Sequence, residues 1–298
     1  MSNASTQARV AAIGLLPSDR NEEHRARIRS LVANDASGSL RRGLNVDQRV
    51  VIMGLRDRDS IAYHAAKELL GRGARVGVTF WQEKIRDKVQ DIADELGVDW
   101  CLPCDVSSDE EITALFPRIA REDGWGGRCI DGIVHSIAFA TQMASIADVT
   151  TQAALDTIKI SALSYSRTVH AALPQLKPGA AAIALGYSGA DRLEPGYDGA
   201  IGGAKAMLDF IMRSMAMDLG KKNGVRFALV SPAPMQTSAA SGLPTFNEMY
   251  GKFLVQSPLH KSVEGRHVGH AIAQLIAPGA ERISGINLLV DGARSVVA

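Results

Sequence analysis

The sequence predicts an α/β fold, a Rossmann-type doubly wound parallel sheet with helices on both faces. Short apolar segments with the character of buried strands recur along the chain, and most are followed by a longer segment that can form a helix. Strands that alternate with helices of this length are typical of a parallel sheet that is covered on both faces. The crossovers of such a sheet are almost always right-handed.

The first elements follow the polar N-terminal segment. Residues 49–54 (RVVIMG) are apolar and form a predicted strand, and residues 60–72 after them form a predicted helix. Residues 74–80 (ARVGVTF) and 82–96 repeat this pair of strand and helix. A third strand is predicted within residues 98–106.

The same alternation continues to the C-terminus. Residues 109–122 form a predicted helix, residues 132–136 (GIVHS) a strand, and residues 150–173 one long helix. The remaining predicted elements are strand 181–185, helix 202–219, strand 226–230, helix 263–277 and strand 286–290. No internal repeat is found, and we expect a single domain over residues 46–298.

Residues 1–45 differ from the rest and are predicted to form a partly helical N-terminal extension. The segment is polar, and its one plausible helix covers about residues 21–33, which Ser18 could cap at the start. Glutamates early in this helix and arginines later in it suit the helix dipole. We expect the extension to pack on the body of the protein or on a neighbouring subunit; the alternative is a dedicated partner-binding arm.

Composition excludes several classes of function. Lys and Arg together number 33 against 32 Asp and Glu, and this formal net charge of +1 gives no overall attraction to nucleic acid or to an anionic membrane. No apolar segment approaches the roughly 18 residues of a membrane span, and the first residues lack the features of a signal peptide. We therefore expect a soluble, cytoplasmic protein that binds neither nucleic acid nor membrane.

The three cysteines, Cys101, Cys104 and Cys129, are too few for a disulfide framework. Cys101 and Cys104 form a CxxC pair, which is redox-active where a helix N-terminus lowers the pKa of a thiol. Here the pair closes a strand-like segment, so we expect no redox role. Without a second pair of ligands we expect no metal site either.

Candidate site residues follow the predicted strands, because open parallel sheets bind ligands beyond the carboxyl ends of their strands. Gly54 allows backbone to approach a phosphate, and the helix that begins near Ser60 directs free N–H groups toward it. Gly54 is only one of the three glycines of the usual dinucleotide fingerprint, and a plain turn is the alternative. Asp105 is placed to accept a hydrogen bond from an adenine amino group; its alternative role is a helix cap.

Two tyrosines and a lysine follow the strand at residues 181–185. Tyr187 and Tyr197 lie in the connection, and Lys205 stands in the first turns of the next helix. An ammonium beside a phenol lowers the pKa of the phenol from about 10 and can anchor ribose hydroxyls. Such a pair suits hydride transfer to a carbonyl or conjugated alkene; the alternative is two loop aromatics and a surface lysine. His135 is expected to be buried and structural.

Taken in order, these segments resemble the enoyl-acyl-carrier-protein reductases, a divergent branch of the short-chain dehydrogenases. The resemblance extends from about residue 45 to the C-terminus. The segments that carry it are Gly54-x5-Ser60-Ile61-Ala62, Cys104-Asp105-Val106, residues 131–140 (DGIVHSIAFA), Tyr187 ahead of Tyr197 and Lys205, residues 231–242 (SPAPMQTSAASG) and Val290-Asp291-Gly292.

The resemblance implies a homotetrameric NAD(P)H-dependent reductase of the double bond of a 2-enoyl thioester, carried by acyl carrier protein or coenzyme A. Residues 46–298 would form the reductase domain, with a substrate loop near residues 238–256. The catalytic residues would be Tyr197, which holds the thioester oxygen as an enolate, Lys205, which binds the nicotinamide ribose, and Tyr187, which lines the substrate pocket.

The resemblance also assigns binding positions. The cofactor-binding residues would be Gly54, Ser60, Ile61, Trp81, Asp105, Val106, Ser136, Ile137, Lys205, Pro234, Met235 and Thr237. The substrate-binding residues would be Ala140, Tyr187, Tyr197 and Ala239.

The sequence departs from the family pattern at several points. The segment between Tyr197 and Lys205 is one residue longer than in the family, and the tyrosine of ordinary short-chain dehydrogenases is replaced by Ile201. Ala233 and Ala293 stand where the family has glycine. These departures favour a specialised substrate, such as one of a secondary pathway. The alternatives are a reductase-like enzyme for a ketone or an imine, and a non-catalytic nucleotide-binding protein.

The cofactor preference depends on the residues that follow the second strand. Phe80-Trp81-Gln82 places neither a carboxylate for the ribose 2′-hydroxyl nor a basic residue for a 2′-phosphate directly after it. Trp81 can stack near adenine, which favours NADH, although Lys84 and Arg86 also allow NADPH. The alternative role for Trp81 is a core aromatic beneath the next helix.

Overall fold

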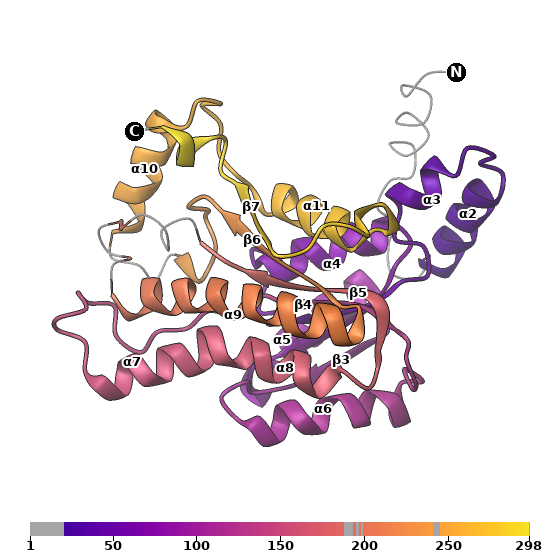
Figure 1. The fold of residues 1–298 in the computed structure, drawn as a ribbon, viewed down its shortest axis with the longest axis horizontal. Helices are drawn as coiled ribbons and strands as arrows, with labels where there is room; N and C mark the ends of the chain where they lie inside the picture. The colour runs from indigo at the N-terminus through magenta and orange to yellow at the C-terminus, as the bar shows by residue number, and fades with distance from the viewer. Residues whose placement is uncertain (1–20, 188–192, 195–196, 198, 241–244, 298) are drawn as a thin grey trace.

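Seven parallel strands form one sheet in the order β3-β2-β1-β4-β5-β6-β7. The computed structural model describes residues 21–187, 193–194, 197, 199–240 and 245–297. The sheet confirms the predicted doubly wound fold, with the strand order reversing between β1 and β4 (Figure 1). The strands are β1 (Arg49–Met53), β2 (Arg75–Phe80), β3 (Trp100–Pro103), β4 (Ile130–His135), β5 (Leu176–Leu185), β6 (Arg226–Pro232) and β7 (Ile286–Val290).

Helices cover both faces of the sheet. The helices discussed below are α2 (Asn21–Ala33), α3 (Ser39–Gly43), α4 (Ile61–Gly71), α5 (Arg86–Leu96), α6 (Asp109–Glu122), α7 (Thr151–Ile158), α8 (Ser164–Ala172), α9 (Ala200–Asn223), α10 (Phe246–Gln256) and α11 (Gly265–Ile276). α4, α5 and α11 bury Leu69, Ile92 and Ile272 against one face. α6, α8 and α9 lie on the other face (Figure 1). In the described residues, no helix is long and apolar enough to cross a membrane.

Local sequence signals set the ends of several helices. Ser60, Ser108 and Thr150 precede α4, α6 and α7, and each side chain accepts a hydrogen bond from a backbone N–H of the first turn. Gly97 and Gly224 end α5 and α9 in the left-handed conformation, which glycine adopts without strain. The caps at Ser60 and Ser108 thus fix where α4 and α6 begin after β1 and β3, at the carboxyl edge of the sheet.

The expected single helix over residues 150–173 is wrong in one respect. A π-helical turn, Lys159–Leu163, separates α7 from α8. Within it, the Ser161 hydroxyl accepts from the backbone N–H of Phe139 (2.9 Å) and donates to the carbonyl of Phe139 (2.8 Å). π-helical turns of this kind are frequent at functional sites. Here the turn connects the helix to the segment that follows β4.

Other predicted boundaries also shift. β3 ends at Pro103 rather than at residue 106, and β5 begins at Leu176, well before the expected residue 181. The helix expected over residues 82–96 opens with a 3₁₀ turn, Glu83–Ile85. α3 was not predicted. Within the expected substrate loop, residues 238–256, the second half is helix α10.

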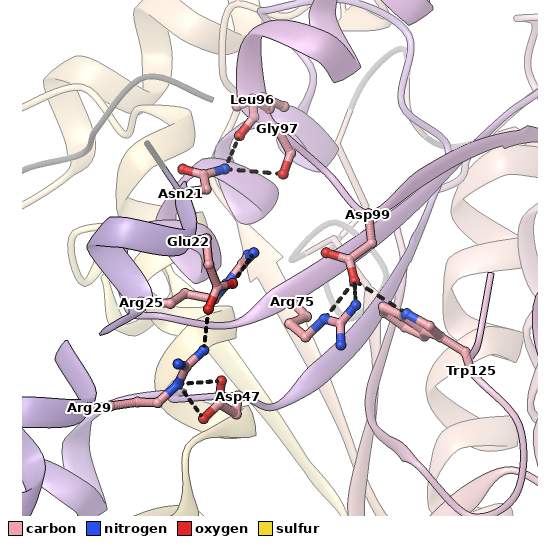
Figure 2. Close-up of polar contacts among 10 residues, drawn as sticks. All are labelled: Asn21, Glu22, Arg25, Arg29, Asp47, Arg75, Leu96, Gly97, Asp99 and Trp125. Carbon is pink, nitrogen blue, oxygen red and sulfur yellow. Dashed lines mark hydrogen bonds and ion pairs between the residues drawn. The ribbon is translucent and has the colours of Figure 1, made fainter. Parts of the chain in front are cut away.

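The N-terminal helix α2 packs on the body of the protein. The Asn21 side-chain amide donates to the carbonyls of Leu96 (2.7 Å) and Gly97 (3.1 Å) at the end of α5 (Figure 2). His24 Nε2 lies 3.0 Å from the carbonyl of Gly71 at the end of α4. Ile28 is fully buried against α3. α2 and α3 thus cover the end of the sheet opposite to α10 (Figure 1).

The predicted cap of this helix, Ser18, lies outside the described residues.

Asn21→Ala is expected to destabilise the fold. The amide satisfies two carbonyls at a helix C-terminus, and leaving such groups without a donor costs about 1–3 kcal/mol. Denaturant unfolding of the full chain measures this as a lower free energy of unfolding. Arg27→Ala, on the exposed face of the same helix, is the control and should leave the free energy unchanged. Equal free energies for both variants would show that α2 does not brace α5.

Candidate active site

A cleft of about 680 Å³ opens at the carboxyl ends of the strands, where the strand order reverses. Every site residue predicted from the sequence lines it. These residues are Gly54, Ser60, Ile61, Trp81, Asp105, Val106, Ser136, Ile137, Ala140, Tyr187, Tyr197, Lys205, Pro234, Met235, Thr237 and Ala239. Residues from widely separated parts of the chain are therefore brought into one cavity of the size that binds small molecules.

Gly54 gives this cleft a close backbone approach. Its φ of +93° is a conformation that favours glycine, and a Cβ placed there would lie 2.5 Å from the carbonyl oxygen of Ser136. Ser60 stands next to it as the cap of α4, whose N-terminus carries free N–H groups and the positive end of the helix dipole. The residues present therefore fit a dinucleotide pyrophosphate, and a plain turn is the weaker interpretation.

Gly54→Ala is expected to weaken NADH binding at least tenfold. The methyl group would collide with backbone rather than with a movable side chain, so the β1–α4 turn must shift. Binding can be measured by quenching of protein fluorescence or by calorimetry. Gly179→Ala is the matched control, since Gly179 has a similar φ of +85° and no atom within 4 Å of an added Cβ. Equal affinities in both variants would contradict a phosphate cradle at Gly54.

Trp81 lies at the mouth of the cleft and not in the core. Its side chain is 47% exposed, which excludes the alternative of a core aromatic. Its ring lies 6.0 Å from that of Phe139, and Lys84 Nζ stands 5.4 Å from the ring centroid. The site after β2 thus presents an aromatic face with a cation beside it.

Asp105 is not the N-cap of α6, the alternative role considered for it. Its carboxylate accepts from the backbone N–H of Ser107 (2.8 Å), while Ser108 caps α6. The helix-cap interpretation is therefore wrong, and the carboxylate belongs to the turn that lines the cleft.

His135 is structural, as predicted. It is fully buried at the end of β4, and its Nε2 lies 2.8 Å from the hydroxyl of Ser164. Burial, together with the charge of Lys205, lowers the pKa of His135 to about 3, so the ring is neutral. The CxxC pair is equally unreactive, because burial raises the pKa of Cys101 and of Cys104 to about 12.

Lys205 is a buried lysine and not the surface lysine of the alternative interpretation. It is 3% exposed, and its Nζ donates to the carbonyls of Leu185 (2.6 Å) and Ile137 (3.3 Å). These carbonyls end β5 and follow β4, so the ammonium joins the two strands at the base of the cleft. Burial lowers the pKa of Lys205 to about 8, and the group is still mostly protonated at neutral pH.

The two tyrosines form one aromatic wall. The ring centroids of Tyr187 and Tyr197 lie 4.2 Å apart at an interplanar angle of 47°. The Tyr187 hydroxyl donates to the carboxylate of Glu194 at 2.7 Å. Burial raises the pKa of both phenols, so the expectation of a lowered phenol pKa beside Lys205 is wrong. Both tyrosines are neutral hydrogen-bond donors over the physiological range.

Close backbone contacts define the start of α9. A Cβ on Gly199 would lie 2.2 Å from the carbonyl oxygen of Ala144, and one on Gly202 would lie 2.3 Å from that of Tyr197. A side chain at either position would collide with backbone, so the start of α9 requires glycine at both. Asp198, the first residue of the lengthened segment, lies outside the described residues.

Sequence reasoning missed several residues that line the cleft. Ile160 belongs to the π-helical turn, for which the sequence carries no distinct signal. Phe246 and Met249 come from α10. Their spacing of three residues, with Phe253 four further on, is typical of a helix with one apolar face and could have revealed α10.

Comparisons with known proteins agree with this geometry. Residues 54–293 match the family model described as enoyl-(acyl carrier protein) reductase. The chain is 35% identical over 260 residues to the NADH-dependent enoyl-acyl-carrier-protein reductase of Haemophilus influenzae, covering 86% of this chain and 97% of that one. The corresponding Bacillus subtilis enzyme is 32% identical, over 84% of this chain and 97% of its own.

Solved structures show the same likeness. The Bacillus cereus enoyl-acyl-carrier-protein reductase with NADP⁺ and indole naphthyridinone superposes with a TM-score of 0.81 and 30% identity, covering 86% of this chain and 99% of that one. The Anaplasma phagocytophilum reductase in complex with NAD gives 0.78 and 29%, over 87% and 96% of the two chains. Because the family model matches residues 54–293, which is most of this chain, the chain belongs to the enoyl-(acyl carrier protein) reductase family.

Proposed function

We propose that this protein is an NAD(P)H-dependent reductase of the double bond of a 2-enoyl thioester carried by acyl carrier protein or coenzyme A. The observation that carries the proposal is a single cleft in which Tyr187, Tyr197 and Lys205 face a dinucleotide cradle at Gly54. Relatives named as NADH-dependent enoyl-acyl-carrier-protein reductases support the substrate class and favour NADH. The exposed ammonium of Lys84 beside Trp81 is placed to pair with a 2′-phosphate, which makes NADPH the second candidate cofactor.

The side chains of the cleft have distinct parts in this reaction. When bound, the reduced nicotinamide supplies a hydride to the β-carbon of the enoyl group. Tyr197, neutral because burial raises its pKa, donates a hydrogen bond to the thioester oxygen as negative charge develops there. Lys205 would bind ribose hydroxyls and contributes positive charge from a position that the protein shields from solvent. Tyr187 closes the pocket on the substrate side, together with Ala140 and Ala239.

The remaining proposed binding positions surround the dinucleotide. Asp105 and Val106 face adenine, Ser136 and Ile137 face the ribose, and residues 234–237 hold the carboxamide and phosphates. Residues 46–298 carry the whole reaction in this proposal, since every lining residue of the cleft lies in that range. Residues 1–45 form an N-terminal extension in this proposal, and its described part, residues 21–45, packs on the opposite end of the sheet.

A homotetramer is part of the proposal. Exposed apolar side chains gather on the neighbouring helices α7 and α9: Leu155, Met207, Phe210 and Met217. Apolar side chains gathered in this way on an outer face are typical of an interface between subunits. Light scattering should give the mass of four chains, and Phe210→Asp should reduce it; a monomeric wild type would contradict the assembly. A cytoplasmic location is also proposed, which the three free cysteines support.

Cofactor oxidation by the purified protein tests the activity. NADH and NADPH are each supplied with short and medium 2-enoyl thioesters, on coenzyme A and on acyl carrier protein, and the loss of reduced nicotinamide is followed by absorbance. We expect oxidation that depends on the double bond, with no rate for the saturated thioesters, and a faster rate with NADH. Dinucleotide binding without turnover of any enoyl thioester would overturn the proposal, and ketones and imines would then be tested.

A further inference from the structure

Glu194 contacts both tyrosines of the cleft. Its carboxylate accepts the hydrogen bond of the Tyr187 hydroxyl at 2.7 Å, and its backbone carbonyl accepts the N–H of Tyr197 at 2.9 Å. The two rings lie in contact between these hydrogen bonds, with centroids 4.2 Å apart and planes tilted by 47°. One residue therefore joins the side chain of the first tyrosine to the backbone of the second.

The hydrogen bond to Glu194 is favourably placed. Tyr187 is only 8% exposed, and a hydrogen bond from a buried phenol to an ionised carboxylate is stronger than a neutral one. The carboxylate itself is half-buried. A phenol has one O–H group, and that of Tyr187 donates its hydrogen bond to Glu194. The Tyr187 oxygen can therefore only accept hydrogen bonds from the substrate. The donor that remains for the thioester oxygen is the phenol of Tyr197.

The lengthened segment makes this contact important. Tyr197 is followed by one residue more than the family pattern before Lys205, and extra chain length at this point gives the tyrosine freedom to move. On the downstream side, Gly202 leaves room for the Tyr197 carbonyl, because a Cβ there would lie 2.3 Å from its oxygen. The carbonyl of Glu194 holds the N–H on the upstream side. Glu194 thus holds the backbone of Tyr197, the residue whose side chain carries the chemistry.

We infer that Glu194 is a positioning residue for the reaction: its carboxylate fixes Tyr187, and through the contact between the two rings and the backbone hydrogen bond it holds Tyr197 against the substrate. This inference rests on the proposed function. The role is indirect, because Glu194 acts on the substrate only through the two tyrosines. It leaves Tyr197 as the sole phenol that donates to the thioester oxygen.

The kinetic test uses the full chain with four variants: Glu194→Ala, Glu194→Gln, Tyr187→Phe and the double variant Glu194→Ala/Tyr187→Phe. Glu194→Ala is expected to lower kcat about tenfold with little change in KM for NADH. Glu194→Gln keeps an acceptor oxygen and should recover most of the rate. The double variant should be no slower than the slower single variant, since both remove the same contact. Leu193→Ala, on the exposed neighbouring side chain, is the control and should keep the wild-type rate.

A second measurement needs no turnover. With only five tyrosines in the chain, labelling of the phenol carbon Cζ with ¹³C gives a simple NMR spectrum, in which Tyr187→Phe identifies the Tyr187 signal. Glu194→Ala should shift that signal and the Tyr197 signal, whereas Leu193→Ala should shift neither. An unmoved Tyr187 signal, additive kinetic effects, or a Glu194→Gln variant as slow as Glu194→Ala would overturn the inference. Absence of enoyl reduction in the wild type, with the shifts present, would instead refute the proposed function.

Discussion

Tyr197→Phe is expected to lower kcat for enoyl reduction by about 10²–10³-fold, the loss typical of removing one donor to a developing oxyanion. The phenol of Tyr197 is neutral because burial raises its pKa, so its proton is available to the thioester oxygen at all physiological pH values. The ring keeps its contact with Tyr187 in the variant, and only the donor is lost. The measurement is steady-state cofactor oxidation under saturating NADH and enoyl thioester.

The affinity for NADH should stay close to wild type in Tyr197→Phe, because the phosphate cradle at Gly54 lies on a different part of the cleft. Tyr63→Phe is the control: that hydroxyl faces Glu95 on α5, outside the cleft, and its removal should not change kcat. A wild-type rate in Tyr197→Phe would remove Tyr197 from the mechanism. A loss of NADH binding without loss of kcat would assign it to the cofactor instead.

The sequence predicted the fold and the position of the cleft because both depend on local patterns. Continuous apolar segments such as residues 50–53 indicate buried parallel strands, and the ends of such strands meet at one edge of the sheet. Small or polar residues at those ends, such as Gly54 and Asp105, then indicate a ligand site. The strand ends predicted Gly54, Asp105 and Lys205 as parts of one cavity, whereas positions such as Pro234 and Ala239 came from the family resemblance.

What the sequence did not predict depends on contacts between distant segments. The π-helical turn at Lys159–Leu163 is joined to Phe139 through Ser161, and neither segment alone specifies the contact. Trp81 stays 47% exposed because Phe139 and Lys84 cover only part of its ring, and no local pattern predicts this exposure. Burial in the assembled cleft raises the pKa of Tyr197. Sequence reasoning expected the opposite direction, because it considered only the charge of Lys205.

Lys205→Met is expected to weaken NADH binding at least tenfold and to lower kcat by about 10²-fold. The substitution keeps the aliphatic stem but removes the ammonium at the base of the cleft, and with it the donors to Leu185 and Ile137. Ribose hydroxyls then lose a charged donor, and the developing charge on the thioester oxygen loses a buried positive charge that lines the same cleft. Lys221→Met, exposed near the other end of α9, is the matched control.

The pH dependence separates the charge of Lys205 from its packing. Burial lowers the pKa of Lys205 to about 8 in the free protein, so the ammonium is present below that pH and is lost as the pH rises through it. A bound dinucleotide that uses the ammonium favours the protonated form and raises the pKa. The Kd for NADH should therefore be constant below about pH 8 and rise above it, whereas Lys205→Met should bind weakly with no such rise. If the Kd for NADH rises above about pH 8 in Lys205→Met as well, the pH dependence belongs to another group. Lys205 would then contribute to the cleft through the packing of its side chain alone.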